Sequence, residues 1–343
     1  MFRKLPRHSR SCSILLARGF TAIGRTKRSF ASTPPSSSLN GNVFHADTDT
    51  DTDTHPNGTQ TTKNQQKKLP SHANVVVVGG GIIGTSVAYH LAKMGVEDVI
   101  LLERDKITCG TTWHAAGLIN TFGSLSATST AMRMYTKKLY SEILPEETSM
   151  DTGYYPVGFI ELACDQHRLE YYRRVAAFNR LCGVKVEEIS PERVKEKFPL
   201  VDTHGVLAGF YVEDDGRVNP YDATMALLRG AKMYGARIYE GVAVEGVTTT
   251  NYMRICSISG KTIKDAIPRV TGVTLESGHV IKANNVVNCA GMWARQFGEK
   301  CGVNIPNQAA EHYYLITEPM EEVDPSWPVV EDSSKCVYIR PGK

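Results

Sequence analysis

The chain has 343 residues, of which 41% are hydrophobic and 22% charged, as is typical of globular proteins and not of disordered, collagen-like or coiled-coil ones. This length accommodates about two domains. The longest apolar stretch, residues 75–84, is too short to span a bilayer, which takes about 20 residues. Eight cysteines without a C-x-x-C pair are too sparse for a disulfide scaffold or a zinc ribbon, so we expect reduced thiols and no metal site.

The net charge of +3 comes from the start of the chain. Residues 1–46 hold six Arg, two Lys and no acidic residue, which leaves 31 basic against 36 acidic residues elsewhere. This Arg- and Ser-rich segment is typical of an organellar transit peptide, and its apolar run at 13–17 is too short for a secretory signal. Residues 28–32 resemble a mitochondrial processing site. We therefore predict a mitochondrial, matrix address in 1–46, with a basic disordered arm as the alternative, and neither a nucleic-acid nor a membrane partner.

Residues 47–72 begin with four Asp-Thr repeats and continue with a Gln-, Lys- and Thr-rich run, which predicts a disordered linker. The β-branched run Ala73–Val78 then predicts a parallel strand that is buried on both faces. A helix over residues 82–94, stopped by Gly95, and a second buried strand over 98–102 complete one βαβ unit.

The rest of the chain alternates between helical and strand patterns. Ser190 followed by Pro191, and Asn219 followed by Pro220, are typical helix starts. The patterns predict helices over 124–148, 166–182 and 220–234. They predict strands over 155–162, 206–212, 237–247, 269–275 and 280–288.

The six residues Gly79–Gly84 match G-x-G-x-x-G between a strand and a helix. Gly79 makes the tight turn, Gly81 lets the backbone approach a pyrophosphate, and Gly84 lets helix and strand pack closely. The N–H groups and positive dipole end of the helix then face the phosphates. Glu103 follows the second strand, where a carboxylate accepts hydrogen bonds from ribose hydroxyls. Strand, helix and acid together indicate dinucleotide binding, with the choice between FAD and NAD left open by the motif.

Two later segments favour FAD. Residues 287–291 (Val-Asn-Cys-Ala-Gly) follow a buried strand and resemble the strand that runs under the ribityl chain in flavoproteins. Residues 109–118 (Cys-Gly-Thr-Thr-Trp-His-Ala-Ala-Gly-Leu) form a Gly-, Thr- and Ala-rich loop that would run along the pyrophosphate towards the isoalloxazine ring. The predicted cofactor-binding residues are Gly79, Gly81, Ile82, Ile83, Gly84, Glu103, Arg104, Gly110, Thr111, Thr112, His114, Ala115, Gly117, Leu118, Val244, Ala290, Gly291 and Trp293.

These patterns predict an α/β fold, a doubly wound, Rossmann-like FAD-binding domain with an inserted α+β substrate domain. We assign 73–150 to the first part of the FAD-binding domain and 151–235 to the insertion. We assign 236–300 to the second part of the FAD-binding domain and 301–343 to a truncated substrate and active-site segment.

Several segments together resemble the mitochondrial sarcosine and dimethylglycine dehydrogenases, which are FAD-dependent and D-amino-acid-oxidase-like. The resemblance covers residues 73–343. It rests on the segments GTTWHAAGL, YPVGFIELA, NPYDATMALLRGAKMYGA, VVNCAGMWARQFG and EHYYLITEP.

The resemblance implies oxidation of an N-methyl amine by net hydride transfer to FAD, with electrons passed to an electron-transfer flavoprotein. It implies that His114, in the motif Gly-Thr-Thr-Trp-His, carries FAD covalently through the 8α-methyl carbon. It also implies that His312 and Tyr338 lie on strands facing the flavin and act on the substrate amine, which must be unprotonated. Arg340 could pair with a substrate carboxylate. The alternative for all three is an ordinary structural or surface residue.

Family members continue past the segment Pro341–Lys343, with a last flavin-domain strand and a folate-binding region, so we expect a fragment or truncated product and a folate site only in the missing part. A non-catalytic homologue like the pyruvate dehydrogenase phosphatase regulatory subunit is a second reading, which His114 disfavours. A third is another FAD-dependent amino-acid oxidase. Sarcosine and dimethylglycine remain equal candidates as substrate, as do oxygen and a flavoprotein as electron acceptor, although the mitochondrial address favours the flavoprotein.

Overall fold

The structure, a computed structural model, describes residues 68–251, 253–255, 259, 262–264 and 268–342; the predicted transit peptide and residues 47–67 of the predicted linker lie outside them. The strands are β1 (His72–Val78), β2 (Val99–Leu102), β3 (Leu118–Ile119), β4 (Phe159–Ala163), β5 (Val186–Ile189), β6 (Ala208–Val212), β7 (Gly216–Arg217), β8 (Arg237–Tyr239), β9 (Val244–Thr250), β10 (Met253–Ile255), β11 (Thr262–Lys264), β12 (Arg269–Leu275), β13 (Val280–Asn288), β14 (Val329–Asp332) and β15 (Val337–Ile339). The helices are α1 (Ile82–Lys93), α2 (Ala127–Lys138), α3 (Leu144–Thr148), α4 (Gln166–Leu181), α5 (Pro191–Lys197), α6 (Pro220–Met233) and α7 (Ala294–Lys300), with short turns η1 (Thr112–His114), η2 (Leu139–Ile143) and η3 (Gly291–Trp293).

The first sheet has the strand order β8-β2-β1-β13-β12-β9. Strands β8, β2, β1 and β13 are parallel, whereas β12 and β9 run antiparallel to their neighbours. In β1, Val76 lies between Ile100 of β2 and Val286 of β13. The buried parallel strand that the β-branched run predicts is therefore confirmed, and so is the α/β class.

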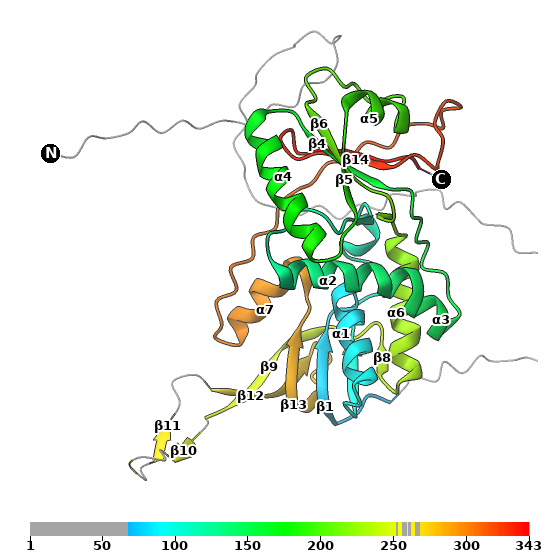
Figure 1. The fold of residues 1–343 in the computed structure, drawn as a ribbon. Coiled ribbons are helices and arrows are strands. Elements are labelled where there is room, and N and C mark those ends of the chain that lie inside the picture. Colours follow the sequence, from blue (N-terminus) through cyan, green and yellow to red (C-terminus); the bar gives the residue numbers. More distant parts are fainter. Residues whose placement is uncertain (1–67, 252, 256–258, 260–261, 265–267, 343) are drawn as a thin grey trace, which may run out of the picture. The chain divides into compact units, whose positions relative to one another are not determined.

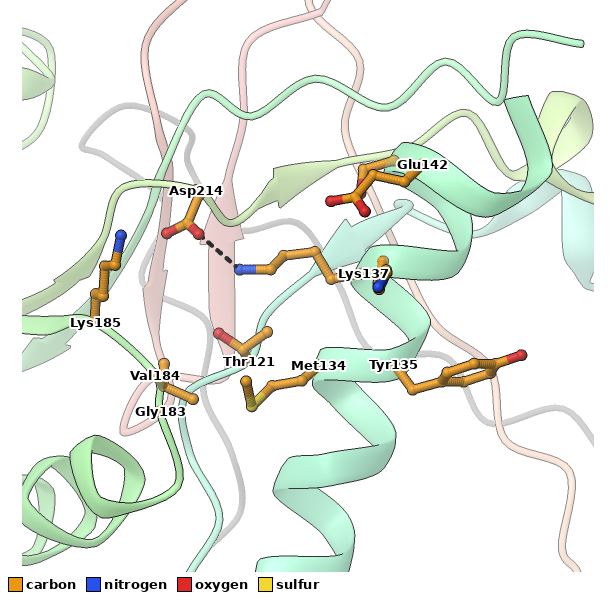
Figure 2. Close-up of a pocket in the computed structure, with 11 residues that line it drawn as sticks. Thr121, Met134, Tyr135, Lys137, Glu142, Gly183, Val184, Lys185 and Asp214 are labelled. Carbon is orange, nitrogen blue, oxygen red and sulfur yellow. Dashed lines mark hydrogen bonds and ion pairs between the residues drawn. The ribbon is translucent and has the colours of Figure 1, made fainter. Parts of the chain in front are cut away.

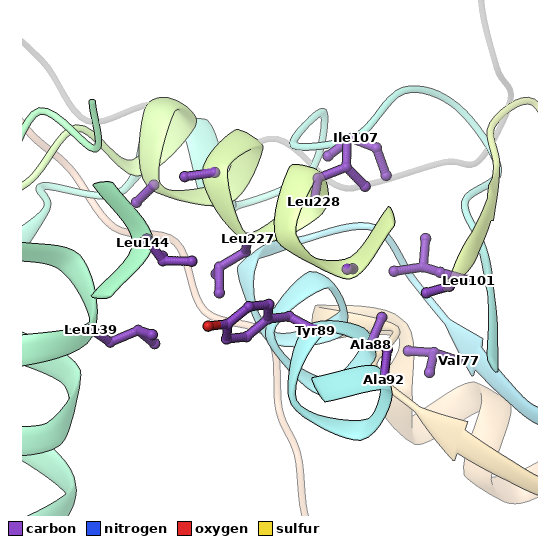
Figure 3. Close-up of a cluster of buried hydrophobic side chains, with 14 of the residues drawn as sticks. Val77, Ala88, Tyr89, Ala92, Leu101, Ile107, Leu139, Leu144, Leu227 and Leu228 are labelled. Carbon is purple, nitrogen blue, oxygen red and sulfur yellow. The ribbon is translucent and has the colours of Figure 1, made fainter. Parts of the chain in front are cut away.

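Both faces of the first sheet are covered by apolar side chains. On one face, Val77 and Leu101 meet Ala88 of α1 and Leu227 of α6 in one buried cluster (Figure 3). On the other face, side chains including Val76 and Ile100 pack in a second cluster with Phe297 of α7. Burying a side chain of this size stabilises the fold by about 1.5–3 kcal/mol, so these two layers hold the glycine turn that follows β1 in place.

The second sheet has the strand order β15-β14-β4-β6-β5. Its strands β4, β5, β6 and β14 lie together beside α4 and α5 (Figure 1). Its strand β4 pairs in parallel with β14 and antiparallel with β6. Side chains of α4 pack against Phe210 of β6, and Val194 of α5 packs with Ile160 on the other face. A two-residue ladder between β3 and β7 joins the loop after η1 to the segment after β6.

Some elements differ from those expected. The helix predicted over 124–148 is interrupted by the π turn η2, because Pro145 has no N–H to bond the carbonyl four residues earlier. The strand predicted over 237–247 breaks between β8 and β9, where Val242 donates its N–H to the carbonyl of Glu103. Within the described ranges, no helix has both the length and the apolar character needed to cross a membrane.

Candidate functional site

The glycine turn after β1 packs closely against backbone atoms of the chain. Gly79 has a φ of +110°, and a Cβ there would lie 2.3 Å from the carbonyl oxygen of Cys289. A Cβ on Gly84 would lie 1.9 Å from the carbonyl oxygen of Gly79. A Cβ on Gly81 would approach only the Thr112 hydroxyl, at 3.0 Å. The first and third glycines of the motif are thus required by packing, whereas the second borders the loop that holds His114.

The helix α1 begins directly after the glycine turn. Its cap residue, Gly81, offers no side chain, and the first turn holds no acidic residue. The N–H of Ile82 donates to the Thr112 hydroxyl at 3.0 Å, and Thr85 makes the first helical bond, to Gly81. A helix N-terminus of this kind attracts anions through its N–H groups and its dipole, and here Ile83, with an exposed side chain, is part of it.

Glu103 lies beside the glycine turn at the end of β2. Its side chain is 8% exposed, and its two carboxylate oxygens accept the N–H groups of Gly80 at 2.6 Å and Asp105 at 2.9 Å. The thiol of Cys109 also donates to one of these oxygens, at 3.7 Å. A carboxylate offers about four acceptor positions, so these three bonds leave one for a further donor.

The ends of β2 and β13 also meet through a cation–π pair. The guanidinium of Arg104 stands 3.9 Å from the ring of Trp293, in η3. Ala290 and Gly291 lie between β13 and this ring, and Gly110 lies near it, since a Cβ there would be 4.0 Å away. Val244 differs from these residues, because it packs against the apolar cluster at the start of β9.

His114 ends the turn η1 with its side chain exposed. Its ring lies 3.7 Å from that of Trp113, and its Nδ1 is 3.4 Å from the hydroxyl of Tyr314. No hydrogen bond to Nε2 of His114 is found in the part of the chain that the structure covers. The loop around it contains the predicted residues Thr111, Thr112, Ala115, Gly117 and Leu118, of which Leu118 opens β3.

The predicted catalytic residues lie in different settings. His312 is exposed in residues 303–320, which contain no strand, so the expected strand position is wrong for this histidine. Tyr338 does lie on a strand, β15, and is 42% exposed. Among the described residues, no hydrogen bond or ring contact joins His312 to Tyr338 or to His114. Arg340 follows β15 with an exposed side chain.

A buried polar network that the sequence analysis missed lies on the second sheet. The Glu161 carboxylate accepts hydrogen bonds from Asn120 at 3.0 Å and from Tyr172 at 2.9 Å, and also from Ser333 at 3.1 Å. Burial, together with the charge of Glu331 opposite it on β14, raises the pKa of Glu161 to about 7. The sequence feature that could have revealed this network is one acidic residue inside an otherwise apolar strand. The partners of that residue, however, come from distant segments.

A cavity of about 380 Å³ opens between α2 and the segment before β5 (Figure 2). Lys137 lies there with its Nζ 3.2 Å from Asp214 and 3.4 Å from the buried Asp215. Asp215 in turn accepts two hydrogen bonds from Thr121. The residues predicted to bind cofactor or to act in catalysis do not line this cavity, and Lys137, one of the three lysines that do, is already paired.

Comparisons with known proteins agree with this geometry. A family model described as FAD dependent oxidoreductase matches residues 74–343, and one described as pyridine nucleotide-disulphide oxidoreductase matches 22–117. Among solved structures, L-proline dehydrogenase from P. horikoshii is 28% identical with a TM-score of 0.58, over 68% of this chain and 57% of that one.

Three mouse (Mus musculus) proteins are similar in sequence. Mitochondrial sarcosine dehydrogenase is 36% identical over 79% of this chain and 28% of its own length. The mitochondrial pyruvate dehydrogenase phosphatase regulatory subunit is 36% identical over 82% and 30%, and mitochondrial dimethylglycine dehydrogenase is 35% identical over 78% and 29%. The chain thus spans less than a third of the length of these relatives. It belongs to the FAD dependent oxidoreductase family, and it is similar to sarcosine and dimethylglycine dehydrogenases.

Proposed function

We propose that this chain is the flavin-binding part of an enzyme that oxidises the N-methyl group of a small N-methylated amino acid, dimethylglycine or sarcosine. The observation that carries the proposal is the arrangement of residues at the carboxyl ends of β1 and β2. The closed glycine turn and the Glu103 carboxylate lie at the start of α1, and the exposed His114 lies two residues past Thr112, whose hydroxyl accepts the N–H of Ile82. The relatives named sarcosine and dimethylglycine dehydrogenases support the substrate class.

The residues present fit FAD. Gly79 and Gly84 leave no room for a Cβ and so let the turn and α1 pack closely, while Gly81, at the N-terminus of α1, has no side chain to keep a pyrophosphate away. Glu103 would hold ribose hydroxyls, and the exposed His114 would hold the cofactor covalently. When bound, FAD supplies the two-electron oxidising chemistry, while the protein positions it.

The chain's own residues then act on the substrate. Arg340 would pair with the carboxylate of the amino acid through its forked donors. Tyr338 and His312 would hold the amine unprotonated, since a protonated amine has no lone pair to support loss of hydride from carbon. Because His312 is exposed and makes no contact with Tyr338 among the described residues, its part in this role requires that residues 303–320 rearrange when substrate binds.

Location and partners follow from the same proposal. A mitochondrial matrix location is supported by the acid-free, Arg-rich residues 1–46 and by relatives named as mitochondrial. The electron acceptor we propose is an electron-transfer flavoprotein. A folate site, if the whole protein has one, would lie outside this chain.

A second candidate is a regulatory, non-catalytic role. The regulatory subunit of pyruvate dehydrogenase phosphatase is as similar to this chain, at 36% identity, as sarcosine dehydrogenase is. Identity therefore does not separate the two functions. The exposed His114 favours the enzyme, because a covalent flavin link needs an accessible imidazole.

The deciding experiment asks whether flavin is attached and reducible. The purified chain should keep yellow, fluorescent flavin through acid precipitation and on a denaturing gel, whereas His114→Ala should release it. His204→Ala, which alters another exposed histidine, is the control and should keep the flavin. Anaerobic mixing with dimethylglycine or sarcosine should bleach the flavin absorbance. Flavin that is attached but bleached by neither amine would contradict the proposed substrates, and release of all flavin from the parent chain would contradict covalent attachment.

A further inference from the structure

Arg217 is a buried arginine at the point where the two sheets are linked. Its backbone pairs with Leu118 of β3 on one side and forms a bridge with Tyr155 on the other. Leu118 lies four residues past His114, in the loop that we propose runs along the flavin. The backbone of Arg217 is therefore held directly against that loop.

The side chain of Arg217 reaches carbonyl groups of two separate segments. It is 4% exposed, and its two terminal nitrogens donate to the carbonyl oxygens of Pro341 and Gly342 and, at 3.1 Å, of Pro325. Its Nε is buried and has no hydrogen-bond partner among the described residues. Pro341 directly follows Arg340, so this guanidinium holds the end of the segment that carries Tyr338 and Arg340.

The guanidinium of Arg217 lies over the ring of Tyr155, 5.4 Å from its centroid. No carboxylate lies within ion-pair distance of it among the residues whose positions the structure gives. Burial, and then the positive charge of Arg340, lower the pKa of Arg217 from its ordinary value. A buried charge is destabilising unless it is paired, so an arginine kept here without an acid indicates that its forked donors and its charge serve a purpose beyond stability.

We propose that Arg217 is a positioning residue that fastens the Tyr338–Pro341 segment to the flavin loop, and so orients Arg340 towards a carboxylate-bearing substrate. This inference rests on the proposed function for the identity of the ligand, and not for the fastening itself. The planar fork of arginine spans two carbonyls at once, which a lysine ammonium cannot do in the same fixed geometry.

The test compares Arg217→Gln, Arg217→Lys and the control Arg173→Gln, which removes an exposed arginine paired with Glu188. Hydrogen exchange of peptides covering 329–342 reports the fastening without any need for flavin. Stopped-flow reduction of the bound flavin over a range of dimethylglycine concentrations separates the apparent Kd from the limiting rate.

We expect Arg217→Gln to speed exchange in 329–342 at least tenfold while β1 exchanges as in the parent. The same variant should raise the Kd for dimethylglycine at least tenfold and leave the limiting rate within about threefold. Arg217→Lys should speed exchange and raise the Kd nearly as much as Arg217→Gln, because it keeps the charge but lacks the fork that fastens the segment. Arg173→Gln should match the parent in both measurements.

Parental exchange in Arg217→Gln, or equally fast exchange in β1, would overturn the inference, the latter by showing a general loss of stability. A parental Kd in Arg217→Gln would overturn it as well. If the parent itself binds neither dimethylglycine nor sarcosine, the proposed function fails, and the exchange measurement alone then decides the fastening.

Discussion

The first and second sheets bury different kinds of side chain. Around the strands of the first sheet the buried side chains are largely apolar, and the buried carboxylate there is Glu103, next to the glycine turn. The second sheet buries Glu161 and Asp332 within its strands, and Asp215 and Arg217 lie just past β6 at 0% and 4% exposure.

This difference indicates which kinds of group each sheet offers to a ligand. The first sheet offers backbone groups, a closed turn and a helix N-terminus, whose charges are fixed by the fold. The second offers side chains whose protonation and direction depend on burial and on distant partners. Under the proposed function, we expect cofactor binding to tolerate little change at Gly79 and Gly84, and substrate oxidation to depend on pH and on side-chain networks.

The largest expected effect is at His312, in the strand-free segment 303–320 that precedes β14 of the second sheet. We expect His312→Ala to slow flavin reduction by dimethylglycine or sarcosine by about 10²–10⁴-fold, the usual contribution of an acid–base partner. Tyr338→Phe, which loses one hydrogen bond, should cost about 1 kcal/mol. Stopped-flow absorbance measures both, and the attached flavin should be unchanged. Parental rates in both variants would make the pair structural, and loss of flavin would assign them to the cofactor instead.

The second largest effect is expected at Gly84, where the backbone next to the first sheet leaves no room for a side chain. Because a Cβ would lie 1.9 Å from a carbonyl oxygen, Gly84→Ala must displace α1 from β1. We expect a loss of about 3 kcal/mol or more in the free energy of unfolding, together with loss of bound flavin. Gly246→Ala, where the nearest atom is a Lys300 side-chain carbon 3.9 Å away, is the control. Urea denaturation of both variants checks this, and equal stabilities would mean that the turn is not closely packed.

The pH dependence of the second sheet should show at Glu161. Its folded pKa of about 7 lies above the ordinary 4.5, so folding favours the neutral acid. This stabilisation is complete below pH 4.5 and is lost as the pH rises through 7. We expect Glu161→Gln to match the parent near pH 4.5 and to be more stable by up to about 3 kcal/mol above pH 8.

Urea denaturation at several pH values measures this difference. Glu187→Gln, at an exposed position of β5, is the control and should follow the parent at every pH. A stability difference between Glu161→Gln and the parent that is the same at every pH would show that folding does not raise the pKa of Glu161, and would contradict the prediction.

The smallest expected effect is at the Arg104–Trp293 pair. Cation–π contacts at partly exposed sites contribute about 0.5–1 kcal/mol. A double-mutant cycle with Arg104→Met and Trp293→Leu should give a coupling free energy of that size in thermal or urea denaturation. A coupling near zero would show that the contact between Arg104 and Trp293 does not stabilise the fold, and would leave cofactor binding as the proposed role of both residues.

Much of the first region could be predicted from the sequence. The β-branched strand, the glycine spacing and Glu103 are local features, and their chemistry depends on neighbours within one βαβ unit. The second region could be predicted less well. The segment with His312 has an apolar and aromatic pattern typical of a strand, yet whether it pairs depends on which edge accepts it, and the structure describes no strand there.

The sequence by itself therefore determined the α/β class, the glycine turn after β1 and the acid at the end of β2, because strand burial and turn geometry follow from residues close together in the chain. The tertiary structure alone decided that Asn120 and Ser333 surround Glu161, and that Arg217 holds Pro325 and Pro341. These contacts join residues more than 40 positions apart. The position and charge state of such side chains are set by the desolvation and the partners that the completed fold supplies.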